Sequence, residues 1–172
     1  MESQKTFLFV RGLPAAGKIT VAKELEKQLG WKVVWLHAIK NAIYDIVKEH
    51  DLSELMRQVL EPIVEYLLQR GDSVIFVRPA TETETVRRME RLVNSYPGYR
   101  FCLVTLTADR EELMRRAIAR QDPYRINNEE RMDEYFSRSG VLEVYGPDEL
   151  VIDTTGLTLT EVIRSIRERF QI

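Results

Sequence analysis

The chain has 172 residues, 44% of them hydrophobic and 30% charged, which is enough for one domain with a core of its own. A formal net charge of -2 gives no overall positive field and so argues against a protein that binds nucleic acid or anionic membranes through bulk charge. The single cysteine, Cys102, excludes an intramolecular disulfide and suits a reducing compartment.

Nothing in the sequence directs the chain to a membrane. The N-terminus lacks the charged and then apolar pattern of a signal peptide, and no apolar run approaches the roughly 18 residues needed to span a bilayer. No linker, repeat or low-complexity tract divides the chain. We therefore expect a single cytoplasmic domain over residues 1–172, with no membrane partner.

The first elements of the chain follow the order strand, loop and helix. Residues 6–11 form a short apolar run before a turn signal, which is typical of a strand buried on both faces. Apolar side chains at helical spacing then predict a helix from Gly17 to about Leu29, which Gly30 would end. A second strand and a second helix are predicted over residues 32–36 and 38–50.

The same alternation continues to the end of the chain. Helical periodicity spans residues 52–70, where Pro62 predicts a kink or a break. The remaining strands are predicted at 73–77, 100–107 and 150–153, and the remaining helices at 82–95, 109–121, 127–138 and 158–170. Asp109 and either Thr158 or Thr160 are the expected N-caps. Strands that alternate with helices in this way indicate an α/β fold with a parallel sheet wrapped on both faces.

The segment between the first strand and the first helix follows the pattern G-x-x-x-x-G-K-[ST] at every fixed position except the last. Its residues are Gly12, Leu13, Pro14, Ala15, Ala16, Gly17, Lys18, Ile19 and Thr20. The two glycines allow a tight turn whose N–H groups face an anion, and the helix N-terminus adds partial positive charge. We interpret these nine residues as a phosphate-binding loop.

Lys18 would supply the mobile cation for the terminal phosphates, whereas Ile19 stands where a hydroxyl normally binds Mg²⁺. Thr20 keeps a hydroxyl one residue later, so the loop is expected to hold phosphate while holding Mg²⁺ poorly. The alternative is that the glycines only shape a turn and that Lys18 is a solvated surface residue.

With Gly-Leu-Pro-Ala-Ala-Gly-Lys at 12–18, the chain resembles the small P-loop kinases over nearly its whole length. These are adenylate-kinase-like phosphotransferases, including kinases of the zeta-toxin and polynucleotide 5′-hydroxyl kinase types. The resemblance implies a three-layer P-loop NTPase fold with a five-stranded parallel sheet and a small lid at about residues 120–128. It also implies ATP as the cofactor and the phosphate donor.

The chain departs from these kinases where they bind the acceptor. Their second strand ends in a pattern like D-D-[IL]-R, and here the matching residues are His37, Ala38, Ile39 and Lys40. Lys40 keeps the positive charge and is a candidate substrate-binding residue. His37 is a candidate general base at the carboxyl end of a strand, or alternatively a helix-start residue with a backbone hydrogen bond.

The third strand departs in the same way, because it continues into Val77 and Arg78 where the kinases usually carry an aspartate. Arg78 is a candidate contact for substrate phosphate, and a salt bridge at the strand end is the other interpretation. Together with Ile19, these departures remove three groups that organise Mg²⁺ and the acceptor in the family.

The basic segment at 115–125 resembles the lid of these kinases. Arg116 and Arg120 share a helix face, and Arg125 follows an interruption at Pro123. The resemblance implies that Arg116 and Arg120 neutralise charge on the transferred phosphoryl group and that Arg125 binds substrate. The alternative is a solvated helix face. The last strand and the turn after it, at 151–156, resemble the segment that supports adenine in these kinases.

Two functions follow from these observations. The first is an ATP-binding phosphotransferase that acts on a hydroxyl or phosphate of a small molecule or a nucleic-acid end, with Lys18, His37, Arg116 and Arg120 as catalytic residues. The second is a non-catalytic protein that binds nucleotide or phosphate and has lost Mg²⁺-dependent transfer. The sequence leaves the acceptor, the preferred base and the oligomeric state open.

Overall fold

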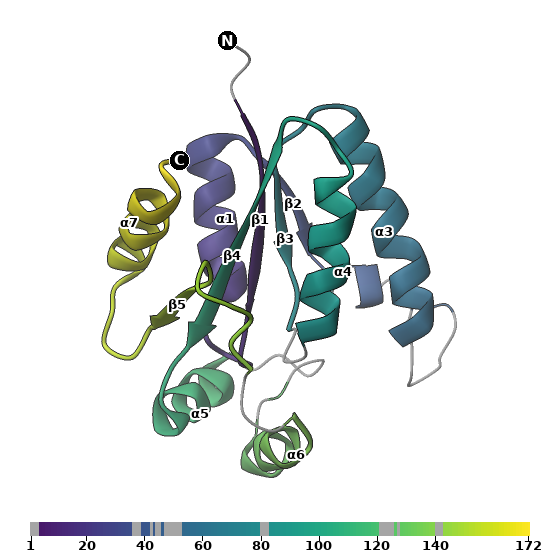
Figure 1. The fold of residues 1–172 in the computed structure, drawn as a ribbon. Coiled ribbons are helices and arrows are strands. Elements are labelled where there is room, and N and C mark those ends of the chain that lie inside the picture. The colour runs from purple at the N-terminus through teal and green to yellow at the C-terminus, as the bar shows by residue number, and fades with distance from the viewer. Residues whose placement is uncertain are drawn as a thin grey trace.

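The computed structural model describes residues 4–35, 39–41, 43, 46, 53–79, 83–120, 126, 128–139 and 143–172. Its centre is a five-stranded parallel sheet with the strand order β2-β3-β1-β4-β5 (Figure 1). The strands are β1 (Lys5–Gly12), β2 (Lys32–Trp35), β3 (Val74–Val77), β4 (Tyr99–Thr107) and β5 (Leu150–Asp153). This confirms the predicted α/β fold with a five-stranded parallel sheet.

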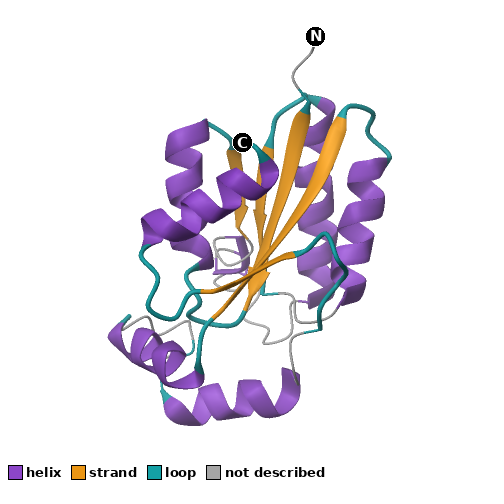
Figure 2. Ribbon diagram, turned by 60° about the vertical axis from the view of Figure 1, so that its left-hand side comes forward, coloured by secondary structure: helices purple, strands orange, loops and turns teal. Residues whose placement is uncertain are grey.

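Helices cover both faces of the sheet, and the structure therefore has three layers (Figure 1). One face carries α1 (Lys18–Leu29) and α7 (Leu159–Phe170), and the other carries α3 (Ser53–Gln69) and α4 (Thr83–Asn94). Two further helices, α5 (Arg110–Ala119) and α6 (Glu129–Ser139), lie beyond the carboxyl ends of the strands (Figures 1 and 2).

Strand β1 divides the core into two halves. Leu8 and Val10 face α1 and α7, whereas Phe7 and Phe9 face α3 and α4, and all four are fully buried. This alternation is what a central strand between two helical layers requires. The predicted strand at 6–11 is thus the middle of the sheet, and it leads directly into the loop at 12–20.

The helix boundaries agree with the local signals in most places. Asp109 caps α5 by accepting from the Glu112 N–H at 2.8 Å, and Thr158 forms a capping box with Glu161 at the start of α7. Helix α3 runs through Pro62 without a break, contrary to one of the two predicted outcomes. Pro62 is exposed, while Leu60 and Val64 on either side are buried and hold the helix against the sheet.

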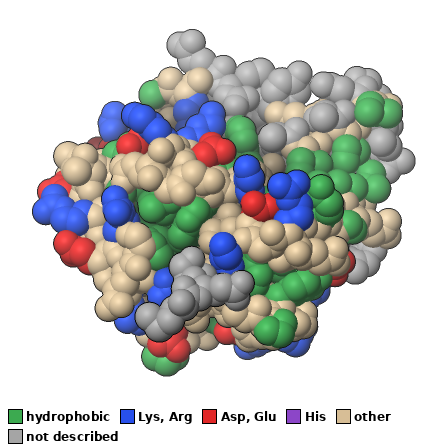
Figure 3. All heavy atoms as spheres, turned by 90° about the horizontal axis from the view of Figure 1, so that it is seen from above, with side chains coloured by type: hydrophobic (Ala, Val, Ile, Leu, Met, Phe, Trp, Pro, Cys, Tyr) green, Lys and Arg blue, Asp and Glu red, His purple; other side chains and the backbone are tan. Residues whose placement is uncertain are grey.

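Seen from the amino ends of the strands, lysine and arginine side chains lie among acidic, apolar and polar ones (Figure 3). Among the described residues, no helix is both long and apolar enough to cross a membrane.

Candidate functional site

The loop at 12–20 lies at the carboxyl end of the central strand, where open α/β sheets bind their ligands. Gly12 has φ 138°, and a Cβ atom built there would lie 1.9 Å from the Leu106 carbonyl oxygen of β4. The next residue, Leu13, donates its N–H to the same oxygen at 3.2 Å. Only glycine therefore fits where the chain leaves β1, because the loop turns directly against the neighbouring strand.

The loop then closes through two more residues in the left-handed region. Ala15 has φ 64°, which is uncommon for a residue with a side chain, and Gly17 has φ 91° at the N-cap of α1. Ala16 donates its N–H to the Leu13 carbonyl at 3.3 Å, and Val21 donates to Gly17 at 3.0 Å. These contacts fix a compact turn that opens into a helix N-terminus, as an anion-binding loop requires.

Lys18 lies over this loop. Its Nζ donates to the carbonyl oxygens of Gly12 at 2.9 Å and Leu13 at 2.6 Å. The ammonium group is therefore held against the main chain of the loop rather than extended into solvent. A cation in this position adds to the partial positive charge of the α1 N-terminus.

Ile19 contributes packing and no oxygen ligand. Its side chain is partly buried and packs against the hydrophobic cluster between the sheet and the α1 layer. Thr20, the nearest hydroxyl in the helix, is exposed. At the end of β3, Val77 is buried, and Arg78 follows it with a positive charge where a carboxylate would be needed.

These residues do not fit a magnesium ion, which prefers oxygen ligands such as hydroxyl and carboxylate. Within the described ranges, no group of three or more His, Cys, Asp or Glu side chains is arranged to hold a metal. Among the residues that the structure describes, the predicted phosphate-binding loop therefore has no cluster of side chains suited to organising Mg²⁺ beside it.

Arg78 lies next to the loop through its main chain. Its N–H donates to the Val10 carbonyl at 3.3 Å, two residues before Gly12, and the residue is half-buried. Lys40 is half-buried in the helical residues 39–41 that follow β2. His37 and Arg125, and most of the predicted lid at 120–128, lie outside the described residues.

Arg116 joins helix α5 to the turn after β5. Its Nη1 donates to Thr154 Oγ1 and its Nη2 donates to the Thr154 carbonyl, both at 2.9 Å, while its Nε donates to Glu112 at 2.6 Å. Hydrogen bonds from Arg115 and Arg116 lower the pKa of Glu112 to about 2, so this carboxylate stays charged at moderately acidic pH. Arg120 is exposed at the C-cap of the same helix.

We expect the Arg116→Met variant to loosen the turn at 154–158. Amide hydrogen exchange there should become about tenfold faster, because two charge-assisted hydrogen bonds to Thr154 are lost. Arg115→Met is the matched control, since Arg115 contacts the same Glu112 but its side chain is 69% exposed. Equal acceleration in both variants would show that the contacts to Thr154 do not hold the turn.

A buried polar network lies immediately before the loop and is not among the features that the sequence predicted. Arg11 is fully buried, and its guanidinium group donates to Glu149 at 2.6 Å and to Thr105 Oγ1 at 2.8 Å. It also donates to the Glu143 carbonyl at 2.5 Å. The available signal was an arginine at the end of an apolar strand, which needs a partner when buried. The partner, Glu149, could not be identified because it lies 138 residues away.

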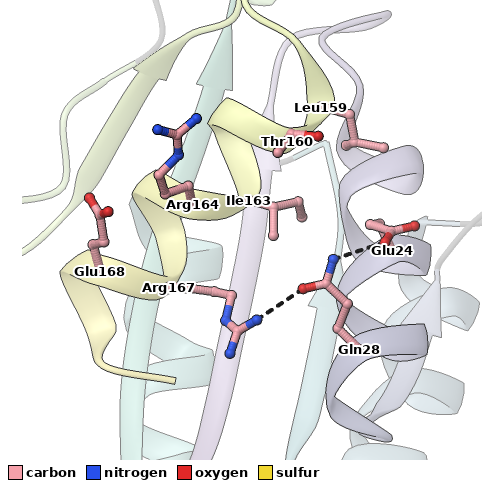
Figure 4. A pocket seen from close by; sticks show the side chains of 8 residues that line it. All are labelled: Glu24, Gln28, Leu159, Thr160, Ile163, Arg164, Arg167 and Glu168. Atoms are coloured by element: carbon pink, nitrogen blue, oxygen red, sulfur yellow. Dashed lines mark hydrogen bonds between the residues drawn. The ribbon is translucent and has the colours of Figure 1, made fainter.

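A groove of about 380 Å³ between α1 and α7 is a separate feature (Figure 4). Arg167 of α7 donates to Gln28 of α1 at 3.1 Å, and Gln28 donates to Glu24 at 2.8 Å. None of its lining residues belongs to the loop at 12–20. The groove is therefore not part of the candidate site.

The sequence is similar to a known family and to a known protein. The AAA domain family (AAA_33) matches residues 7–138. A nucleotide-binding protein from Nocardioides sp. is 32% identical over 163 residues, and the match covers 94% of this chain but 49% of that protein. The chain thus spans about half the length of this curated relative.

Solved structures with the same fold include several kinases. A candidate kinase from Chloroflexus aurantiacus has a TM-score of 0.75 at 20% identity, covering 96% of this chain and 98% of that one. A gluconokinase from Sinorhizobium meliloti has a TM-score of 0.67 at 17% identity, covering 99% and 94% of the two chains. A shikimate kinase from Bacteroides thetaiotaomicron has a TM-score of 0.63 at 14% identity, covering 98% and 99%.

At these identities the solved structures define the fold alone, whereas the family match covers most of the chain. The predicted resemblance to small P-loop kinases is thereby confirmed. The protein belongs to the AAA domain family and has the fold of the small P-loop kinases.

Proposed function

We propose that the chain binds ATP at the loop 12–20 and transfers the terminal phosphoryl group to a hydroxyl or phosphate of a small molecule or a nucleic-acid end. The observation that supports this most directly is the position of Lys18, whose ammonium group lies on the loop at the carboxyl end of the central strand. The shared fold with kinases and the named nucleotide-binding relative support the same proposal.

In this proposal each basic residue has a separate task. The loop amides and Lys18 hold the β- and γ-phosphates. Arg116 lies on α5 and Arg120 directly follows it. Both offset the charge that develops on the transferred group. Arg78, which lies beside β1 through its main-chain hydrogen bond, and Lys40 bind the acceptor. His37 and Arg125 keep their proposed roles as general base and substrate contact.

The turn at 154–158 is the proposed support for the nucleotide base. Thr154 donates its N–H to the Thr107 carbonyl at 2.8 Å and receives two hydrogen bonds from Arg116. Asp109 and Asp153 are tied to the same turn through Thr155, at 2.8 and 2.9 Å. A turn held this firmly gives the base a preformed edge, which reduces the entropy cost of binding.

A second function is favoured by a specific set of residues. Three departures replace the hydroxyl and acidic groups that would organise Mg²⁺ and the acceptor in a kinase of this fold: Ile19, His37-Ala38 and Val77-Arg78. A chain with these residues would bind nucleotide or phosphate without transferring it, and would act as a sensor or as a partner of a catalytic subunit.

A titration of ATP with and without Mg²⁺, combined with ADP release in the presence of a panel of hydroxyl and phosphate acceptors, separates the two functions. Acceptor-dependent ADP release supports phosphoryl transfer. Binding that is unchanged by Mg²⁺, with no turnover, supports the non-catalytic function and contradicts the first. Failure to bind both ATP and inorganic phosphate would contradict both.

A further inference from the structure

Strand β4 has an edge that its neighbour covers only in part. β4 has nine residues and β5 has four, and the two strands pair only from Val104 to Thr107. Among the described residues, no strand pairs with 99–103 on the β5 side of β4. Figure 1 shows the first half of β4 running on past the amino end of β5.

The main chain on this edge offers hydrogen-bonding groups. The Thr107 carbonyl accepts from Thr154 on the β5 side, whereas the Leu106 carbonyl accepts from Leu13 on the β1 side. Main-chain groups alternate between the two sides of a strand, so those of Leu103 and Phe101 point to the same side as Thr107. An edge of this kind pairs with an amide of a ligand in the way that it would pair with another strand.

A hollow of about 520 Å³ lies along this edge. Its floor is the segment 100–103 of β4, one wall is α4, a second is the segment 145–149, and the end of α7 with Phe170 closes it. The volume falls within the usual range for small-molecule sites. None of the lining residues belongs to the loop at 12–20, so the hollow is distinct from the proposed nucleotide site.

The charges around the hollow favour an anion. Arg100 is half-buried, and no carboxylate among the described residues pairs with it: its Nη2 donates to Thr6 Oγ1 at 3.3 Å, while its buried Nε has no hydrogen-bond partner. The three acidic lining residues are already engaged, because Glu149 pairs with Arg11, Asp148 lies 3.9 Å from Arg169, and Glu90 accepts from a tyrosine hydroxyl. A partly buried, unpaired guanidinium group is costly, and an anion beside it would offset that cost.

The Cys102 thiol in the floor of the hollow adds no charge of its own. Burial raises the pKa of Cys102 to about 11, so the side chain is a neutral apolar group at physiological pH. Tyr145 in the wall is neutral as well, since burial and its hydrogen bond to Glu90 raise its pKa to about 12. The hollow therefore combines a lining arginine, Arg100, with an apolar surface and a main-chain edge.

We propose that this hollow binds a small carboxylate that also carries an amide and an apolar group. The carboxylate pairs with Arg100, the amide bonds to the main-chain edge at Phe101 and Leu103, and the apolar group packs on Phe170. The occupant also contacts the segment 145–149, which holds Arg11 one residue before the phosphate loop.

The test uses N-acetyl-leucine as the probe and N-acetyl-leucinamide, its neutral analogue, as the comparison. Amide chemical shifts of the full chain are followed during titration with each compound. We expect saturable shifts at 100–103 and 145–149 with the carboxylate, and affinity about tenfold weaker for the neutral analogue, since a hydrogen bond to a charged group is lost. Shifts confined to the loop at 12–20, equal affinity for both compounds, or no binding would each overturn the proposal.

Variants locate the site and separate it from the nucleotide site. Arg100→Met keeps the aliphatic stem of the side chain and should weaken the carboxylate about tenfold. Arg91→Met is the matched control, because Arg91 is an exposed arginine of α4 that pairs with Glu84 outside the hollow. Lys18→Ala should leave the affinity for N-acetyl-leucine unchanged. If Arg100→Met does not fold, Arg169→Met at the rim is the substitute, with a smaller expected loss in the same direction.

Discussion

Replacement of Lys18 by alanine is expected to weaken ATP binding about 10- to 100-fold, as measured by calorimetric titration. The ammonium group that lies on the loop is the mobile cation of the proposed site, and a hydrogen bond to a charged phosphate contributes more than one between neutral groups. The fold should tolerate the change, because the lost contacts are two part-buried hydrogen bonds to loop carbonyls, and no core packing is removed.

Lys23→Ala is the matched control for this variant. Lys23 carries the same charge on the same helix, but its Nζ lies 5.8 Å from the centre of the Trp35 ring instead of on the loop. Retention of affinity in Lys23→Ala together with loss in Lys18→Ala would assign phosphate binding to the loop. Equal losses in the two variants would mean that only general charge attraction is involved, and unchanged affinity in both would exclude the loop as the nucleotide site.

The loop was predictable because its signals are local. The strand, the two glycines and the following helix occupy consecutive positions, and each has a direct backbone cause. The close approach of Gly12 to Leu106 shows why glycine is needed there, although the sequence cannot indicate which strand lies alongside. The cap at Asp109 was predictable for the same reason, and the cap of the last helix was narrowed to Thr158 or Thr160, since each observed cap bonds to a residue three positions away.

Contacts between distant segments were not predictable. The sequence placed Arg116 on a lid-like helix face, but its bonds to Thr154 connect residues 38 positions apart. The strand order β2-β3-β1-β4-β5 could not be predicted either, because hydrophobic patterns locate the strands along the chain but do not show which strands are neighbours in the sheet. Pro62 shows a further case, in which packing of the flanking residues preserves a helix that local propensity would interrupt.

The departures at Ile19, Val77 and Arg78 are linked by their chemistry. A single missing ligand could be replaced by a nearby oxygen, but here the hydroxyl position packs against the core, and the strand end that would carry a carboxylate is a buried valine followed by an arginine. A cation beside the loop repels a metal ion and attracts phosphate. These residues therefore fit the proposed anion site better than a metal site, and the proposal predicts that nucleotide binding depends little on Mg²⁺.

The buried pair between Arg11 and Glu149 is expected to contribute strongly to stability. Both side chains are 0% exposed, and Glu149 also accepts from the Tyr145 N–H at 2.6 Å. Glu149→Ala leaves the guanidinium group buried without its counter-ion, so the free energy of unfolding should fall by about 3–5 kcal/mol. Urea denaturation followed by circular dichroism measures this as a lower midpoint with an unchanged slope.

The double variant Arg11→Met/Glu149→Leu separates the cost of an unpaired charge from the contribution of the pair itself. Replacing both partners with apolar residues of similar volume is often close to neutral, so the double variant should regain most of the stability that Glu149→Ala loses. Glu84→Ala removes an exposed partner of Arg91 and should change the midpoint little. If Glu149→Ala behaves like Glu84→Ala, the buried pair does not hold the strand end that precedes Gly12. If the double variant is as unstable as Glu149→Ala, the end of strand β1 is held by the hydrogen bonds that Arg11 donates to Thr105 and to the Glu143 carbonyl.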